Sequence, residues 1–194
     1  MTRFLGLAAL FVAASAAPAS AVLIDFEGIA AANTVTTESG FRDIDGVRFA
    51  TTHGHIIDGA YASAGGYYSQ NGTSWFMQDN TAPLTVSMAN GASFSLSSFD
   101  VGEYASVGPQ VLTMTLTFAG GGTAVDTFTT DGAGGFQTIA TNYSNLQSIG
   151  LQNSIGRLSF DNFLINESAA VPGPGALGLL GLGIAALGMR RRKA

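Results

Sequence analysis

The stretch Leu112-Thr113-Met114-Thr115-Leu116-Thr117-Phe118 alternates apolar and hydroxyl side chains. Successive side chains of a strand point to opposite faces, so the apolar residues share one face and the threonines share the other. This pattern predicts a strand with one buried face and one solvated face, which is typical of antiparallel sheets.

Shorter runs of the same kind lie on both sides of this strand, separated by turn dipeptides such as Asp45-Gly46 and Asn90-Gly91. The predicted strands cover 22–26, 46–50, 84–88, 93–101, 125–129, 136–140, 146–151 and 157–166. The stretches 30–40 and 60–72 are rich in Gly, Ser and Thr, and we expect them to be surface loops. The sequence therefore predicts an all-β fold, a jelly-roll-like antiparallel β-sandwich.

Two of the predicted strands contain a phase slip. In 93–101 the apolar positions change parity at Ser97-Ser98, and in 157–166 they change parity at Asp161-Asn162. An extra residue in one strand of a pair is a β-bulge. We therefore expect a bulge at each of these two places.

Composition excludes several classes of protein. The sequence has no cysteine, which excludes disulfides, thiol catalysis and cysteine zinc sites. Between residues 22 and 171, three arginines stand against thirteen acids, a formal charge of −10. Such a body repels phosphate groups, which excludes nucleic acid as a partner. The motifs of serine hydrolases, zinc proteases, phosphate loops and dinucleotide sites are absent from the sequence.

The N-terminal residues 1–21 have the pattern of a secretory signal peptide. Arg3 precedes a short apolar run, and Ala19-Ser20-Ala21 places small residues directly before Val22. We expect signal peptidase to cleave before Val22, so that the body, residues 22–170, is exported.

The C-terminal segment, 171–194, has three parts in order. Val171, Pro172, Gly173 and Pro174 interrupt any strand, an uncharged apolar run covers 175–189, and the basic tail 190–194 holds Arg190, Arg191, Arg192 and Lys193. An apolar segment followed by bases places the bases in the cytoplasm. We expect one short transmembrane helix at 175–189 that anchors the exported body.

This arrangement resembles the PEP-CTERM sorting signal of Gram-negative bacteria, in which a Val-Pro-Glu-Pro-like motif, a Gly/Leu-rich transmembrane helix and an arginine cluster follow one another. Gly173 stands where that family usually has Glu. The resemblance implies a transient anchor in the inner membrane and removal of the tail by an exosortase. It also implies a final place at the cell surface or outside the cell, in the company of exopolysaccharide.

Aromatic residues gather in a stretch of the body that carries no charge. Tyr61, Tyr67, Tyr68 and Trp75 lie there, followed by Phe76. Flat rings beside amide side chains stack on sugars, so the first four are candidate glycan-binding residues. In the alternative interpretation, Trp75 and Phe76 fill the core while the tyrosines cover a loop.

The ends of the body provide a second resemblance. The stretches 23–28 and 158–165 are similar to the first and last strands of jelly-roll carbohydrate-binding modules and galactose-binding-like domains. In those families an N-terminal Phe-Glu and a C-terminal Asp-Asp/Asn often meet at a structural calcium, which here implies Glu27 and Asp161 as ligands. The residues also allow a second interpretation, in which Asp161 and Asn162 bond to the backbone at a bulge.

Two other groups of side chains suggest chemistry. His53 and His55 share one strand face, and with Asp58 as a third ligand they would bind zinc or copper; a polar strand face is the alternative. The pairs Asp25/Glu27 and Asp100/Glu103 would suit a glycosidase only if they lined an open site. We therefore expect a non-catalytic matrix protein that binds polysaccharide. A structural or adhesive protein without a glycan site and a secreted glycan hydrolase or lyase are the alternatives.

Overall fold

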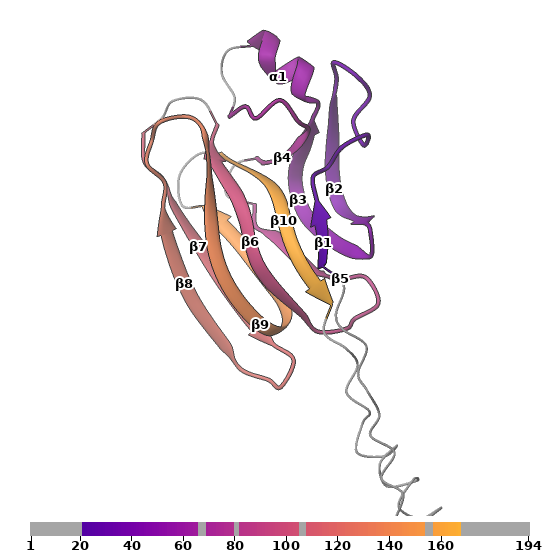
Figure 1. The fold of residues 1–194 in the computed structure, drawn as a ribbon, viewed down its shortest axis with the longest axis vertical. Helices are drawn as coiled ribbons and strands as arrows, with labels where there is room; N and C mark the ends of the chain where they lie inside the picture. Colours follow the sequence, from indigo (N-terminus) through magenta and orange to yellow (C-terminus); the bar gives the residue numbers. More distant parts are fainter. Residues whose placement is uncertain (1–20, 66–68, 80–81, 105–107, 154–156, 168–194) are drawn as a thin grey trace, which may run out of the picture. The chain divides into compact units, whose positions relative to one another are not determined.

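The computed structural model describes residues 21–65, 69–79, 82–104, 108–153 and 157–167. Ala19–Ala170 form one compact unit. Its elements, drawn in Figure 1, are β1 (Ala21–Ile24), β2 (Val35–Ile44), β3 (Val47–Ile57), α1 (Gly59–Gly65), β4 (Trp75–Gln78), β5 (Leu84–Met88), β6 (Phe94–Glu103), β7 (Val111–Phe118), β8 (Thr123–Thr129), β9 (Phe136–Asn153) and β10 (Leu158–Glu167).

Residues 1–20, which make up the predicted signal peptide apart from Ala21, lie outside the described residues. The sorting motif Val171–Pro174, the predicted transmembrane helix and the basic tail lie outside them too. Within the described ranges, no helix is both long enough and apolar enough to cross a membrane.

The strands pair antiparallel in one continuous network that folds into two layers. Strands β1, β10, β4 and β6 form the first layer with the second half of β3 and the start of β9. Strands β5, β7 and β8 form the second layer with the first half of β3 and the end of β9. Since β3 and β9 run through both layers, they join them into a β-sandwich. The prediction of an all-β antiparallel sandwich is confirmed.

Phenylalanine rings fill the space between the layers. Phe26, Phe49 and Phe163 meet at centroid distances of 5.0 to 6.1 Å in edge-on contacts. Phe99 stacks on Phe163 at 5.4 Å, and Phe160 lies beside both of them. These rings are at most 3% exposed, so they contribute the largest apolar burial in the molecule.

Both predicted bulges are confirmed. The register of β10 against β6 shifts between Asp161 and Leu164, where Asn162 has a φ of +50°. The register of β6 against β9 shifts between Leu96 and Ser98. Each bulge turns the following apolar residues back toward the core.

The two predicted loops were wrong in part. Residues from Val35 onward form β2, which pairs with β3, although this part of the expected loop contains Thr36, Thr37, Ser39 and Gly40. Within the expected loop 60–72, α1 covers Gly59–Gly65. This helix is too short to show helical periodicity in the sequence. Its Ala62 is 1% exposed and packs against Ile57, Trp75 and Met77, so tertiary contacts rather than propensity hold it.

We expect Gly54→Ala to destabilise the domain by about 1–3 kcal/mol, because the site is overpacked by even one methyl group. A Cβ at Gly54 would overlap the ring of Phe76, which cannot withdraw from the core. Gly150→Ala is the matched control on β9, where the nearest side-chain atom lies 3.8 Å away on Thr115. Urea unfolding of both variants measures the difference, and equal midpoints would contradict this account of the core.

Candidate functional site

The outer face of the first layer is the face opposite the phenylalanine core. The strand registers place Thr37, His55, Met77, Ser159 and Gly102 in one row across β2, β3, β4, β10 and β6. Residues in register across a sheet point to the same side. Residues of five strands that are far apart in the chain, His55 among them, therefore lie on one surface.

A second apolar cluster covers one end of this outer face. It consists of Ile57, Ala62, Trp75 and Met77, with Tyr104 and Phe136 partly buried against it. Trp75 is 0% exposed, and its ring meets that of Phe136 at 6.2 Å. A fully buried ring has no face to offer a sugar, so for Trp75 the structure supports the core interpretation.

The segment from Ser69 to Ser74 runs along the same face. Ser69 donates a hydrogen bond to the carbonyl of Glu103, and a Cβ at Gly102 would collide with Ser69. Further along, Asn71 Nδ2 and Thr73 Oγ1 donate to the Asp161 carboxylate at 2.6 and 3.0 Å. The segment is therefore fixed to β6 and β10 by its polar side chains.

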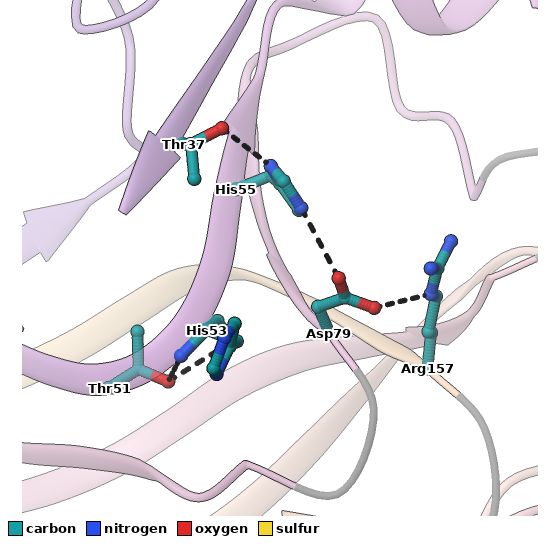
Figure 2. A network of polar contacts seen from close by, with 6 residues as sticks. All are labelled: Thr37, Thr51, His53, His55, Asp79 and Arg157. Atoms are coloured by element: carbon teal, nitrogen blue, oxygen red, sulfur yellow. Dashed lines mark hydrogen bonds and ion pairs between the residues drawn. The ribbon is translucent and has the colours of Figure 1, made fainter. Parts of the chain in front are cut away.

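A polar cluster adjoins this apolar cluster on the outer face, where His55 is in register with Met77 (Figure 2). It consists of His55 on β3, Asp79 directly after β4 and Arg157 directly before β10, which Figure 2 draws, together with Tyr104 directly after β6. Asp79 Oδ1 lies 2.7 Å from Arg157 Nε, and Asp79 Oδ2 lies 3.5 Å from His55 Nε2. The guanidinium of Arg157 stands 5.0 Å above the Tyr104 ring.

Backbone hydrogen bonds hold this cluster together. The Asp79 amide donates to the His53 carbonyl at 3.3 Å, and the Tyr104 amide donates to the Arg157 carbonyl at 3.1 Å. On the far side of His55, Nδ1 lies 3.3 Å from Thr37 Oγ1. The His55, Asp79 and Arg157 side chains are between 17% and 37% exposed, although Asp79 Oδ1, the atom that contacts Arg157, is itself buried.

The polar cluster has the chemistry of a binding site for a hydroxylated or charged ligand. It offers N–H donors from an imidazole and a guanidinium, and acceptors from a carboxylate. The sequence analysis recognised His55 but missed Asp79 and Arg157 as its neighbours. Only the pairing of β3, β4 and β10 brings them together, and no spacing in the chain signals it.

The metal site proposed for His53 and His55 is not assembled as predicted. Asp58 accepts hydrogen bonds from the amides of Asn33 and Ala60, at 2.7 and 3.1 Å, so it caps α1 instead of approaching the histidines. Among the described residues, no group of three or more His, Asp or Glu side chains is placed to hold a metal ion. Asp79, which the sequence did not suggest, is the acid that His55 contacts.

Glu27 and Asp161 reach the same turn of the chain. Glu27 Oε1 accepts from the Ser74 amide at 2.7 Å, next to Thr73, which bonds to Asp161. Strands β1 and β10 are neighbours, as the second resemblance implied. Both carboxylates are occupied by N–H or O–H donors of the protein, and Asp161 also accepts from the Asn162 amide at the bulge. With these donors the two carboxyl groups hold the turn in place through hydrogen bonds. The calcium site itself stays a prediction.

The hydrogen bonds around Asp161 indicate that its carboxyl group carries a proton. Thr73 Oγ1 lies 2.6 Å from Asn71 Oδ1 and 3.0 Å from Asp161 Oδ2, but a hydroxyl has only one proton to donate. A proton on Asp161 Oδ2 would satisfy both contacts, since Thr73 then accepts from Asp161 and donates to Asn71. Burial raises the pKa of Asp161 to about 7, with a smaller contribution from the nearby Asp100 carboxylate and an opposing one from the hydrogen bonds.

The acids that the sequence suggested for glycoside hydrolysis accept hydrogen bonds within the protein, as does Asp161, which it did not suggest for that role; Asp25 accepts from the Glu27 amide and Glu27 from the Ser74 amide. Asp161 faces Asp100 across β6 and has a raised pKa, as a general acid would, but it is 0% exposed and cannot reach a glycosidic oxygen. Asp100 accepts from Thr138 and Asn162 at 2.6 and 2.8 Å. Glu103, 1% exposed, accepts from backbone amides at the 132–134 turn.

The predicted tyrosine site is described only in part. Tyr61 lies on α1 and is 38% exposed. Tyr67 and Tyr68 lie outside the described residues, so their role stays a prediction. The other exposed aromatic residue of the described chain, Phe41, carries the Arg48 guanidinium 4.2 Å above its ring.

Comparisons with known proteins find similarity only among solved structures. No family model matches the sequence. No curated protein matches it either. The CBM22-1 xylan-binding domain of Xyn10C from Paenibacillus barcinonensis aligns with 81% of this chain and 100% of its own, at 14% identity and a TM-score of 0.46.

The CBM22-1–GH10 modules of Xyn10B from Clostridium thermocellum, solved with xylohexaose, align with 80% of this chain and 30% of their own, at 15% identity and a TM-score of 0.45. At such identities and TM-scores the similarity assigns no ligand to the present chain.

We expect the domain to be more stable at pH 5 than at pH 8 because of Asp161. In the folded domain the pKa of Asp161 lies above the ordinary 3.8. Its contribution to the free energy of unfolding is therefore complete below pH 3.8 and is lost as the pH rises through 7. The loss between pH 5 and 8 is on the order of 2 kcal/mol, and Asp161→Asn should remove it. Chemical unfolding at both pH values measures the change.

Asp126→Asn is the matched control. The hydrogen bond from Tyr143 lowers the pKa of Asp126, so this carboxyl stays ionised in both states over the same pH range. The variant should therefore keep the pH 5 to 8 difference of the parent. A parent protein that is equally stable at both pH values, or less stable at pH 5, would contradict the assignment of a proton to Asp161.

Proposed function

We propose that the chain is an exported, non-catalytic β-sandwich protein that binds polysaccharide through the polar cluster on the outer face of its first layer. The observation that carries the proposal is the cluster itself. The His55, Asp79 and Arg157 side chains are oriented by their contacts with one another, they are partly exposed, and they lie at paired strands of one sheet. Sugar hydroxyls are recognised by such pairs of planar polar side chains.

The accessibility and the partners of the acidic side chains fit a protein that binds without catalysis. A glycosidase needs two reachable carboxylates flanking one bond. In the described part of the chain, Asp161 is covered by the turn at Asn71–Ser74, its register partner Asp100 accepts hydrogen bonds from Thr138 and Asn162, and Asp79 is shared between His55 and Arg157. A structural or adhesive protein without a glycan site remains the alternative function.

Export and release complete the proposal. The signal peptide at 1–21 would carry the body across the inner membrane, and the segment 171–194 would hold it there until an exosortase removes the tail. The polar cluster would then act at the cell surface or in the extracellular matrix. This part rests on the sequence pattern and on the resemblance to PEP-CTERM signals.

We expect residues 22–170, which fall within the compact unit, to be retarded by polysaccharide in affinity electrophoresis. His55→Ala should weaken the retardation several-fold, since it removes a hydrogen-bond partner worth about 1 kcal/mol. Thr115→Ala, on the outer face of the second layer, is the control and should bind like the parent. Release of reducing ends from the same polysaccharides would instead indicate an enzyme. No retardation by any polysaccharide would favour the structural or adhesive alternative.

We expect deletion of Val171–Ala194 to release the exported domain from the membrane. The run 175–189 carries no charge and four bases follow it, so we attribute retention of the protein in the membrane to this segment. Fractionation of cells that express the full chain and the deletion measures the change. A truncated protein that still sediments with the inner membrane would contradict the predicted topology.

A further inference from the structure

The positive charges of the body are few, and they are not distributed evenly. Arg42, Arg48 and Arg157 are its only arginines, and it has no lysine. Arg48 donates two hydrogen bonds of 2.8 Å to Asp43. Arg42 contacts Glu38 through Nε and Nη2, at 2.7 and 2.6 Å. Each of these two guanidiniums is thus paired through two nitrogens with one carboxylate.

Arg157 is engaged differently. It contacts Asp79 through Nε, and within the described residues its two terminal nitrogens have no acceptor. Figure 2 shows these nitrogens extending beyond Nε, away from Asp79. The terminal edge of a guanidinium has the geometry to bind a carboxylate through two parallel hydrogen bonds. The Tyr104 ring behind the guanidinium keeps it flat and in place.

His55 lies on the other side of Asp79 from this arginine. His53 and His55 come from β3, and His55 contacts the same Asp79 carboxylate as Arg157. One acid, Asp79, therefore contacts one arginine and one imidazole, in a body whose formal charge is −10.

The aromatic surface does not favour a neutral sugar as the ligand. Neutral pyranose rings are held largely by stacking on an open aromatic face. At the polar cluster the Tyr104 face is covered by Arg157, and Trp75 is buried. Recognition here has to come from charge and hydrogen bonds instead.

We infer that the polar cluster binds acidic polysaccharide, with a uronic acid carboxylate on the terminal nitrogens of Arg157. The inference rests on the proposed function and names its class of ligand. Asp79 then has a double role, because it orients Arg157 but also competes with the ligand carboxylate for the positive charges. Repulsion from the rest of the acidic body is screened beyond about 8 Å at physiological ionic strength.

The test compares polyuronates with neutral forms of the same polymers. Affinity electrophoresis of residues 22–170 would use polygalacturonate and alginate, their esterified derivatives, and neutral xylan. We expect retardation by at least one polyuronate, loss of retardation on esterification, and weakening when ionic strength rises from about 0.05 to 0.5 M. Equal binding to the acidic and esterified forms would overturn the inference.

Two substitutions at the cluster have opposite expected signs. Arg157→Gln should weaken polyuronate binding roughly tenfold, since it removes charge-assisted hydrogen bonds. Asp79→Asn should strengthen it about two- to fivefold, because the competing carboxylate is gone. A neutral ligand would give the reverse result for Asp79→Asn, since it would lose a strong acceptor.

The matched controls are Arg48→Gln and Asp43→Asn, which break a comparable exposed ion pair at the other end of β3. Both should bind like the parent, and the melting midpoint of each variant checks that it is folded. Binding only to neutral xylan, weakened by Asp79→Asn, would overturn the acidic ligand but keep the proposed function. Absence of binding to every polysaccharide would overturn both.

Discussion

The bulge at Asp161–Asn162 is the local constraint on which the rest of the structure depends. In a regular strand, Phe160 and Phe163 would point to opposite faces, because they are three residues apart. The extra residue, with Asn162 at a φ of +50°, turns both rings into the core, where each is 0% exposed. The bulge also directs the Asp161 carboxylate away from the core, toward the Ser69–Ser74 segment that covers the outer face.

The bulge has consequences on both faces of the sheet. On the inner side, the Phe163 ring contacts Phe49 of β3, Phe99 of β6 and Phe26, which lies just after β1. One side chain of β10 therefore packs against three separate parts of the chain. On the outer side, Asp161 fixes the turn at Asn71–Ser74. A carboxylate that is buried in this way costs stability once it ionises, and that cost is offset by the hydrogen bonds it accepts.

The acidic character of the body and the position of its few bases suggest how selectivity would arise. A strongly negative protein discourages contact with anionic polymers over most of its surface. The guanidinium of Arg157, whose terminal nitrogens have no acceptor among the described residues, would reverse that tendency at one place. The cluster would then select a ligand by position and geometry, since an anion that approaches elsewhere finds arginines already paired with Asp43 or Glu38.

The sequence by itself determined the fold class and the details that depend on neighbours in the chain. Alternation of the kind seen in Leu112–Phe118 fixes which residues share a face, so strands such as Leu84–Met88 were predicted with their correct bounds. A change in the parity of apolar residues marked both bulges for the same reason. The charge of the body and the absence of cysteine are also properties of composition alone.

Only the tertiary structure decided which strands are neighbours and what covers each face. Alternation gives a strand two faces but does not say which partner lies beside it, so the approach of Asp79 and Arg157 to His55 was not visible in the sequence. The burial of Trp75 depends in the same way on α1, a helix of one to two turns that packing stabilises and periodicity does not reveal. Long-range register, rather than local pattern, assembled the site.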